Sequence, residues 1–174
     1  LFNLHAYYLN EFMLLEYLKQ KHIKVIYMLF DEYPYLGKCC FSEGCDKFQT
    51  ECKACPQRNA YPTSLFFDRS TFMFNKKRKL FANWKELTLA GVEFLKMQAS
   101  KSAISKGVAF QTIDMGVQLN KIYYPRTVDE LRKKLHISID SKVVVTVGPY
   151  SDERKGIKKF VEIAKKCKEE DIVF

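Results

Sequence analysis

The sequence predicts an α/β fold made of parts of two Rossmann-like domains, with a cysteine-rich loop inserted in the first. Apolar runs of strand length, such as Val25–Phe30 and Lys142–Val147, alternate with segments that have helical spacing of apolar residues, which is typical of parallel βαβ units. The 174 residues are 47% hydrophobic and 28% charged. This composition is that of a globular protein and excludes a disordered or collagen-like chain.

The first predicted elements are a helix, a buried strand and a long loop. Glu11–Gln20 is rich in helix formers and has three apolar residues spaced three apart on one side. The continuous apolar run Val25–Phe30 is typical of a strand that is buried on both faces of a parallel sheet. Asp31–Pro62 is a loop that carries prolines, glycines and cysteines, and a loop of this length needs a function or a stabilising crosslink.

Two more helix–strand pairs follow in the first predicted domain. Arg69–Phe81 predicts a basic helix with Ser70 as its N-cap, and Leu87–Ala90 predicts a short strand. Val92–Ile104 then predicts a helix, and Gly107–Ile113 predicts a third strand.

The same pattern returns near the end of the chain. Thr127–Glu130 has the sequence of a capping box and opens a short helix with an apolar face. Lys142–Val147 predicts a β-branched strand, and residues 156–168 predict a helix with Cys167 in its core-facing side. Asp171–Phe174 begins another strand.

We expect residues 1–120 to form one domain, 121–140 to form a hinge or linker, and 141–174 to begin a second domain. Because the sequence begins with Leu and ends within a predicted strand, we expect it to be an excerpt of a longer protein. No apolar run in the sequence approaches the ~20 residues that span a bilayer.

The chain is basic, with 29 Lys and Arg against 20 Asp and Glu and a net charge of +9. Such a balance favours anionic partners, namely nucleic acid, a membrane surface or a phosphate-bearing substrate. The basic residues are spread over short runs such as Lys76–Lys79 and Lys165–Lys168, which is typical of solvated helix faces.

The cysteine spacing admits three interpretations. Cys52 and Cys55 form a C-x2-C pair, and five residues separate Cys39 from Cys45. Four thiolates can surround a zinc ion tetrahedrally, so these four residues are a candidate structural zinc site, with Cys40 as the spare cysteine. The alternatives are disulfides, which a reducing compartment disfavours, and reduced cysteines that only pack.

Several segments together resemble one family of enzymes. Val25–Cys39 (V-I-Y-M-L-F-D-E-Y-P-Y-L-G-K-C) resembles the V-x-W-T-L-H-D-x-W-P-F-T-G-x-C stretch of family 4 glycosyltransferases, in particular their bacterial capsule and exopolysaccharide branch. Gly44–Pro62 (G-C-D-K-F-Q-T-E-C-K-A-C-P-Q…Y-P) is similar to that branch's G-C-x-x-W-K-T-G-C-x-x-C-P-Q…Y-P. Weaker similarity covers Thr112–Gln118, Tyr124–Ile137 and Val147–Gly156.

The resemblance implies a GT-B enzyme, in which two Rossmann-like domains enclose the active cleft. Such enzymes transfer a sugar from a nucleotide-sugar donor to an acceptor with retention of the anomeric configuration and without a catalytic metal. The implied function is surface polysaccharide synthesis with a saccharide or lipid-linked acceptor. The implied location is the cytoplasm, with peripheral contact between basic helices and an anionic inner membrane face. Residues 1–120 would then be the later part of the acceptor domain, and 141–174 the start of the donor domain.

Four residues are candidates for donor binding. Lys155 falls on the donor-phosphate lysine at the start of a predicted helix, where an ammonium and helix N-terminal amides can hold a diphosphate. Arg154 adds a second cation. Gly148 would allow a ligand to approach the backbone, and Gly116 matches the glycine of the family's N-G-I-D turn. A solvated Arg-Lys pair and a structural glycine are the alternatives.

His5 and Asp31 are the candidate catalytic residues. His5 lies in Phe2–Asn10 (F-N-L-H-A-Y-Y-L-N), which resembles an H-N-I-H-G-Y-Y-L-N segment that faces the cleft. A histidine there could contact the acceptor or handle a proton, and Asp31 could orient an acceptor hydroxyl. The alternatives are a hydrogen-bonded core histidine and a loop-capping aspartate. Phe30 and Phe2 replace two family histidines, and phenylalanine cannot form the hydrogen bonds of imidazole.

Two other classes of function stay open. A degenerate transferase that serves as a binding or scaffold module would keep the fold without catalysis, and the replacements at Phe2 and Phe30 motivate this hypothesis. A basic zinc-binding nucleic-acid protein would explain the net charge and the spaced cysteines. The βα pattern and the lack of a recognisable base-reading module argue against nucleic acid as the partner.

Overall fold

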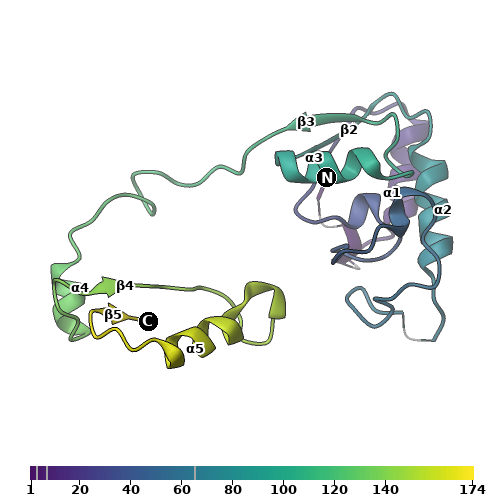
Figure 1. Ribbon diagram of the computed structural model, residues 1–174. Helices are drawn as coiled ribbons and strands as arrows, with labels where there is room; N and C mark the ends of the chain where they lie inside the picture. The colour runs from purple at the N-terminus through teal and green to yellow at the C-terminus, as the bar shows by residue number, and fades with distance from the viewer. Residues whose placement is uncertain (3, 7, 65) are drawn as a thin grey trace. The chain divides into compact units, whose positions relative to one another are not determined.

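The computed structural model describes residues 1–2, 4–6, 8–64 and 66–174, which divide into two compact units (Figure 1). Unit 1 is Leu1–Gly116 and unit 2 is Val117–Phe174. Both units contain parallel strands and helices, which confirms the predicted α/β class. The assignment of the units to an acceptor and a donor domain stays a prediction.

The sheet of unit 1 has three parallel strands in the order β1-β2-β3. They are β1 (Val25–Met28), β2 (Leu87–Gly91) and β3 (Ala109–Thr112). The central strand β2 is almost entirely buried, because it has a strand on either side and packing on both faces. It is therefore β2 that shows the burial expected for a parallel strand between two layers.

Strand β1 is covered on one side only, so the prediction of a strand buried on both faces from Val25 to Phe30 is wrong. Val25 and Tyr27 are buried, whereas Ile26 between them is 61% exposed. The side chains of a strand alternate between its two faces, and β1 lies at the sheet edge, where only one face meets the core. The strand ends at Met28.

The described residues of unit 1 form three α-helices: α1 (Glu11–Gln20), α2 (Ser70–Phe81) and α3 (Glu93–Lys101). Helix α1 has the predicted bounds, and the Asn10 side chain caps it by accepting a hydrogen bond from the backbone N–H of Met13. Its Lys19 ammonium donates to the backbone oxygens of Leu80 and Ala82 at the end of α2. This contact joins α1 and α2, which run side by side in Figure 1.

Two predicted helix ends are corrected. Ser70 is the first residue of α2 and not its N-cap; the carboxylate of Asp68 accepts the hydrogen bond of the Ser70 N–H instead. Helix α3 ends at Lys101, before the predicted Ile104. The Ser102 hydroxyl donates to the backbone oxygen of Tyr35 and accepts from the N–H of Ile104, which directs the chain out of the helix.

The core of unit 1 combines the sheet, the helices and the cysteine-rich loop. Phe74 of α2 and Tyr35 of the loop are fully buried. The loop contributes a second anchor, Phe48, which lies in a short 3-10 helix (Lys47–Gln49) and joins the same cluster. The backbone oxygen of Phe48 also accepts from the N–H of Ala103. The long loop is therefore fastened to the core at two points.

Unit 2 contains α4 (Asp129–Lys134), β4 (Lys142–Val143), a 3-10 helix η4 (Glu153–Lys155), α5 (Ile157–Lys166) and β5 (Ile172–Val173). Strands β4 and β5 are parallel and pair over two residues each.

Three expectations for unit 2 are corrected by its low burial. The predicted strand Lys142–Val147 is paired only at its start, because the neighbouring strand β5 is equally short, and Val147 is 88% exposed. The capping box at Thr127–Glu130 does not form: α4 begins at Asp129 with Val128 as its N-cap, and its apolar face is exposed, so no packing fixes the start of the helix. Cys167 follows the last residue of α5 and is half-buried, outside a core.

Candidate functional site

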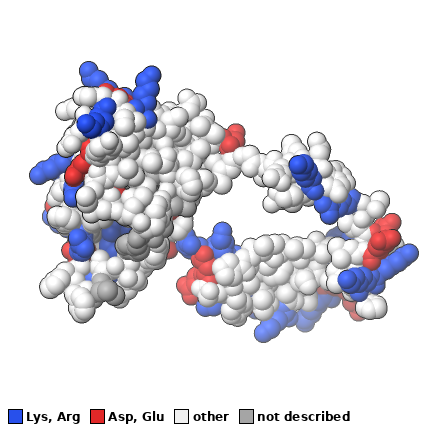
Figure 2. Space-filling view, turned by 180° about the vertical axis from the view of Figure 1, so that it is seen from behind, with Lys and Arg blue, Asp and Glu red and all other residues white. Residues whose placement is uncertain are grey.

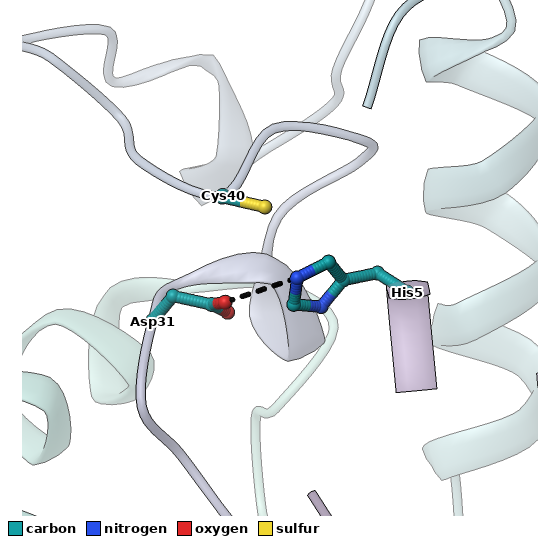
Figure 3. Close-up of side chains that lie close together, drawn as sticks. All are labelled: His5, Asp31 and Cys40. Carbon is teal, nitrogen blue, oxygen red and sulfur yellow. Dashed lines mark ion pairs between the residues drawn. The ribbon is translucent and has the colours of Figure 1, made fainter. Parts of the chain in front are cut away.

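The candidate catalytic residues meet at the end of β1, where the chain leaves the sheet. Asp31 follows β1, and His5 lies in a 3-10 helix, η1 (Leu4–Ala6). The Nε2 atom of His5 is 3.4 Å from Oδ2 of Asp31, and both side chains are largely buried (Figure 3). In open α/β sheets the carboxyl ends of the parallel strands are the usual place for ligands. Asn3 and Tyr7, in the same sequence segment as His5, lie outside the described residues.

Cys40 is a member of this cluster, although the zinc hypothesis treats it as the spare cysteine. Its sulfur points toward the His5–Asp31 pair (Figure 3). Within the described ranges, His5, Asp31 and Cys40 form the one group of three or more potential metal-ligand residues whose ligand atoms lie within 4.8 Å of one another. Sequence reasoning missed this role because Cys40 follows directly after Cys39 and has no spacing signal of its own.

Buried polar contacts hold the cluster in place. The second oxygen of Asp31 accepts a hydrogen bond of 3.0 Å from the backbone N–H of Tyr33, and the ring of Tyr33 lies 4.9 Å from the ring of His5. The hydroxyl of Tyr33 donates to the buried carboxylate of Glu11. The side chains of Asp31 and His5 therefore have few alternative positions.

Lys77 is a buried cation that the sequence did not reveal. It was expected on a solvated face of a basic run, but it is 3% exposed. Its ammonium donates to the backbone oxygens of Tyr33 and Leu36 and lies 3.3 Å from the centre of the Tyr33 ring. Only the tertiary structure supplies these partners.

Burial shifts the pKa values of two charged groups at this site. It raises the pKa of Asp31 above its usual range, against the opposing influence of the Tyr33 N–H and of His5. It lowers the pKa of Lys77 to about 8, because the charged form of a buried amine loses its hydration. Asp31 therefore takes up a proton more readily than an exposed carboxylate does.

An open cleft of about 650 Å³ begins beside Asp31. Phe30, Phe41 and Phe94 present partly exposed rings to it. Among the described lining residues there are carboxylates but neither lysine nor arginine. The four carboxylates belong to Asp31, Glu32, Glu43 and Asp46. A cleft of this kind favours a ligand rich in hydroxyl groups over one rich in phosphate.

Phe2 and Phe30, the two phenylalanines where the resemblance implies histidines, contact each other. The rings of Phe2 and Phe30 are 6.0 Å apart and nearly perpendicular, an arrangement in which aromatic rings attract. Both replacements are thus part of one apolar contact beside Asp31, and neither ring can exchange a proton or a hydrogen bond.

The four predicted zinc ligands line one small cavity. Cys39, Cys45, Cys52 and Cys55 all contribute to a cavity of about 20 Å³. The sulfurs of Cys39 and Cys55 are 3.6 Å apart, too far for a disulfide bond. The four sulfurs do not form a group within 4.8 Å, judged over the described part of the chain. Their predicted role as metal ligands stays a prediction.

Two of the thiols around this cavity are protonated at neutral pH. Burial raises the pKa of Cys39 to about 12 and that of Cys52 to about 11. A zinc ion would therefore displace protons when it binds, since thiolates are the ligands. The buried ammonium of Lys38 donates to three backbone oxygens of the same loop, those of Gln57, Arg58 and Ala60. The loop is thereby fixed around the cavity.

In unit 2 the structure brings two of the predicted donor-binding residues together. A Cβ atom on Gly148 would lie 3.0 Å from the Cβ of Lys155, a tight contact that a larger residue could make only if the neighbouring chain moved. Lys155 ends η4, and Gly156 beyond it has a φ of +68° and caps α5. Arg154 is bound to Asp152 by an ion pair of 2.8 Å, which lowers the pKa of the Asp152 carboxyl. The guanidinium thus already has an anionic partner.

Gly116, the fourth predicted donor-binding residue, is the last residue of unit 1. A Cβ atom at this position would meet no other atom within 4 Å. The structure therefore gives no steric reason for glycine there.

The surface charges are scattered, as the sequence predicted. On the face shown in Figure 2, lysine and arginine side chains lie in separate small groups on each unit, among carboxylates and uncharged surface. Within the part of the chain that the structure describes, no helix is both long and apolar enough to cross a membrane.

The chain is similar to one curated protein, named "Putative colanic acid biosynthesis glycosyl transferase WcaC", from Escherichia coli (strain K12). The two are 29% identical over 97 residues, which are 53% of this chain and 23% of the E. coli protein. This similarity supports a relationship to a glycosyltransferase, over less than a quarter of that protein's length. No family profile matches the chain, and no solved structure is significantly similar to it.

Proposed function

We propose that this chain is part of a retaining glycosyltransferase that moves a sugar from a nucleotide-sugar donor to a saccharide or lipid-linked acceptor in surface polysaccharide synthesis. The similarity to the E. coli protein named for colanic acid biosynthesis supports the class of enzyme. The observation that carries the proposal is the largely buried His5–Asp31 pair at the end of β1, beside an open cleft.

The acceptor would bind in the cleft beside Asp31. Sugar hydroxyls donate hydrogen bonds to carboxylates, and the apolar faces of sugar rings pack against aromatic side chains such as Phe30 and Phe94. Asp31 would accept a hydrogen bond from the reacting hydroxyl and orient it. His5, 3.4 Å from Asp31, would hold this carboxylate in place and exchange a proton with it.

The donor would bind at Lys155 in unit 2. Gly148 and Lys155 lie side by side, and the ammonium of Lys155 would neutralise the diphosphate of a nucleotide-sugar. Arg154 would contribute a second cation only by giving up its ion pair with Asp152. Gly116 would supply backbone access to the donor.

The donor proposal is tested by the variant Lys155→Ala in the natural protein. We expect the affinity for the nucleotide-sugar, measured by isothermal titration calorimetry, to fall at least several-fold. The matched control is Lys166→Ala, an exposed lysine at the other end of α5. Equal affinities in the wild type and Lys155→Ala would remove Lys155 from the donor site.

The catalytic proposal is tested by Asp31→Asn, which keeps the size of the side chain and removes its charge. We expect the transfer rate to fall by about 100-fold or more, the usual contribution of a positioned acid or base. The exposed Asp140→Asn is the control. An unchanged transfer rate in Asp31→Asn would show that this carboxylate only caps the loop and has no role in catalysis.

We also infer a structural zinc ion in the cavity of Cys39, Cys45, Cys52 and Cys55. The cavity of about 20 Å³ has room for one ion. The distance of 3.6 Å between two of the sulfurs is close to the ~3.8 Å edge of a tetrahedral zinc–thiolate site. The denatured Cys52→Ser variant should release about one zinc fewer per chain than the wild type. Equal release would contradict the site.

The Phe2–Phe30 contact favours a second candidate function, a binding or scaffold module that has lost catalysis. An apolar contact stands where the resemblance implies two histidines. Under this alternative the unmodified protein transfers no sugar, and Phe30→His recovers some transfer. Robust transfer by the unmodified protein would end this alternative.

The proposed location is the cytoplasm, with peripheral contact at the anionic inner membrane face, where lipid-linked acceptors lie. The net charge of +9 supports attraction to such a surface. Co-sedimentation with vesicles should be stronger with anionic than with zwitterionic lipid. Equal sedimentation would contradict a charge-driven contact.

A further inference from the structure

We propose that His5, Asp31 and Cys40 bind a divalent transition-metal ion, with zinc as the best match, at a site separate from the four-cysteine cavity. This inference does not depend on the proposed transferase activity, and an ion bound between His5 and Asp31 would replace the proton exchange proposed for that pair. It rests on the distances between the ligand atoms, the contacts that hold them and the charges of three residues, of which His5 comes from η1 and the other two from the cysteine-rich loop.

The spacing of the ligand atoms is close to that of a zinc site. Bonds of about 2.0–2.1 Å from zinc to nitrogen and about 2.0–2.2 Å to oxygen place the two ligand atoms about 3.4 Å apart in a tetrahedron. The Nε2 atom of His5 and the Oδ2 atom of Asp31 are 3.4 Å apart. The sulfur of Cys40 lies within 4.8 Å of both, so a small movement of one side chain completes the site.

Neighbouring contacts orient all three ligands. The other carboxylate oxygen of Asp31 accepts from the N–H of Tyr33, and the backbone oxygen of Cys40 accepts from the N–H of Glu32. The ring of His5 lies against the rings of two tyrosines, Tyr33 and Tyr61. Outer contacts of this kind fix ligand geometry and strengthen metal binding.

The charges of the site balance when zinc is bound. One carboxylate, one thiolate and a neutral imidazole neutralise the two positive charges of the ion. This matters because the site is largely buried, where an uncompensated charge is costly. The nearby cation of Lys77 is matched by the buried carboxylate of Glu11.

The ligand number distinguishes this site from a structural one. Three protein ligands leave one tetrahedral position for water or a hydroxyl group, whereas four cysteines fill every position. Asp31 also borders the open cleft, so a ligand in the cleft has access to the fourth position.

The test is a titration of the metal-free natural protein with zinc, read as equivalents bound per chain. We expect Cys40→Ser and His5→Ala to bind one equivalent fewer than the wild type, or to bind it more than about 10-fold more weakly. The matched controls are Cys167→Ser, a cysteine of unit 2, and His22→Ala, an exposed histidine that also pairs with a carboxylate. Wild-type stoichiometry and affinity in both cluster variants would overturn the proposal.

A second measurement needs no variant. The ring nitrogens of His5, His22 and His136 can be followed by NMR of the intact, ¹⁵N-labelled protein while zinc is added. We expect only the His5 nitrogen to show the large shift of metal coordination. A spectrum in which all three histidines are unchanged at saturating zinc would overturn the proposal, whatever the variants do.

Discussion

Units 1 and 2 have the same alternation of strands and helices, but they bury their apolar residues to very different extents. Unit 1 has a continuous core in which Tyr35, Phe74 and Leu89 are almost inaccessible. In unit 2, which the structure describes throughout, no residue is buried. Its strands pair over two residues each, and Val145 and Val147 are exposed.

This difference shows what an apolar pattern specifies and what it does not. The pattern selects the type of element, because apolar residues at strand or helix spacing favour that element. Burial also needs a covering partner for each face. Strand β2 has one on both sides, whereas Val145 and Val147, beyond β4, belong to no strand pair among the described strands. Four predictions test this comparison, from the largest expected effect to the smallest.

The largest contrast is expected between two phenylalanines, one in a helix of each unit. Phe74→Ala in α2 should lower the free energy of unfolding of unit 1 by about 3–5 kcal/mol, because it leaves a cavity in a closed core. Phe160→Ala in α5 should cost about 1 kcal/mol, since that ring is only half-buried against Phe174. Denaturant unfolding, read from Trp84 for unit 1 and from NMR amide signals for unit 2, measures both. Equal costs would mean that unit 2 has a core in solution.

The packing around the cysteine cavity predicts an intermediate effect. A Cβ atom on Gly37 would lie 2.9 Å from the Cβ of Cys52 and from the backbone oxygen of Ser70. Gly37→Ala should therefore destabilise unit 1 by about 1–3 kcal/mol, as overpacking does. Gly116→Ala is the control, because its added methyl group meets open space. Thermal unfolding without added metal compares the two variants. Similar melting temperatures would show that the loop moves to accommodate the added methyl group.

The buried amine of Lys77 predicts a pH dependence of unit 1 that unit 2 lacks. The pKa of Lys77 is about 8 in the folded protein, against an ordinary value of 10.5 that applies to the unfolded chain. Between pH 8 and pH 10.5 the unfolded chain therefore binds more protons than the folded protein. The contribution of Lys77 to the free energy of unfolding should therefore rise with pH above about 8, by roughly 1 kcal/mol up to pH 9. The raised pKa values of Cys39 and Cys52 act in the opposite direction as the pH approaches 9.0, the ordinary value for these thiols. The difference between the wild type and Lys77→Met, measured from pH 7 to 9, therefore isolates Lys77, and an equal pH dependence of the two proteins would contradict the prediction.

The smallest effect is expected at Val147 in unit 2. Because the side chain is 88% exposed, Val147→Thr should change the free energy of unfolding by less than about 0.5 kcal/mol. Hydrogen exchange of the neighbouring amides measures this locally. A larger loss would show that the segment is covered in solution and would remove the contrast between the units.

The sequence predicted the type and order of the main elements, because these depend on local periodicity. It failed where burial depends on distant segments. Val25–Phe30 looked equally apolar along its length, but Ile26 faces an uncovered side of β1. The sequence of Thr127–Glu130 matches a capping box, but no packing fixes the start of the helix at that point.

The candidate site was predictable in part for the same reason. His5 and Asp31 came from a resemblance in two separate segments, and the structure brings them within 3.4 Å. Cys40 and Lys77 were missed. A cysteine beside another cysteine, and a lysine within a basic run, carry no pattern that tells a buried residue from an exposed one. Their partners come from elements far away in the chain.

The adjacency of Cys39 and Cys40 has a thermodynamic consequence. One lines the cysteine cavity and the other joins His5 and Asp31, so a single peptide unit belongs to both clusters. An ion bound at either cluster would restrict the motion of that peptide. Less conformational entropy would then be lost when an ion binds at the other cluster. Two such ions would therefore bind with positive cooperativity, and each would raise the affinity for the other by the same factor.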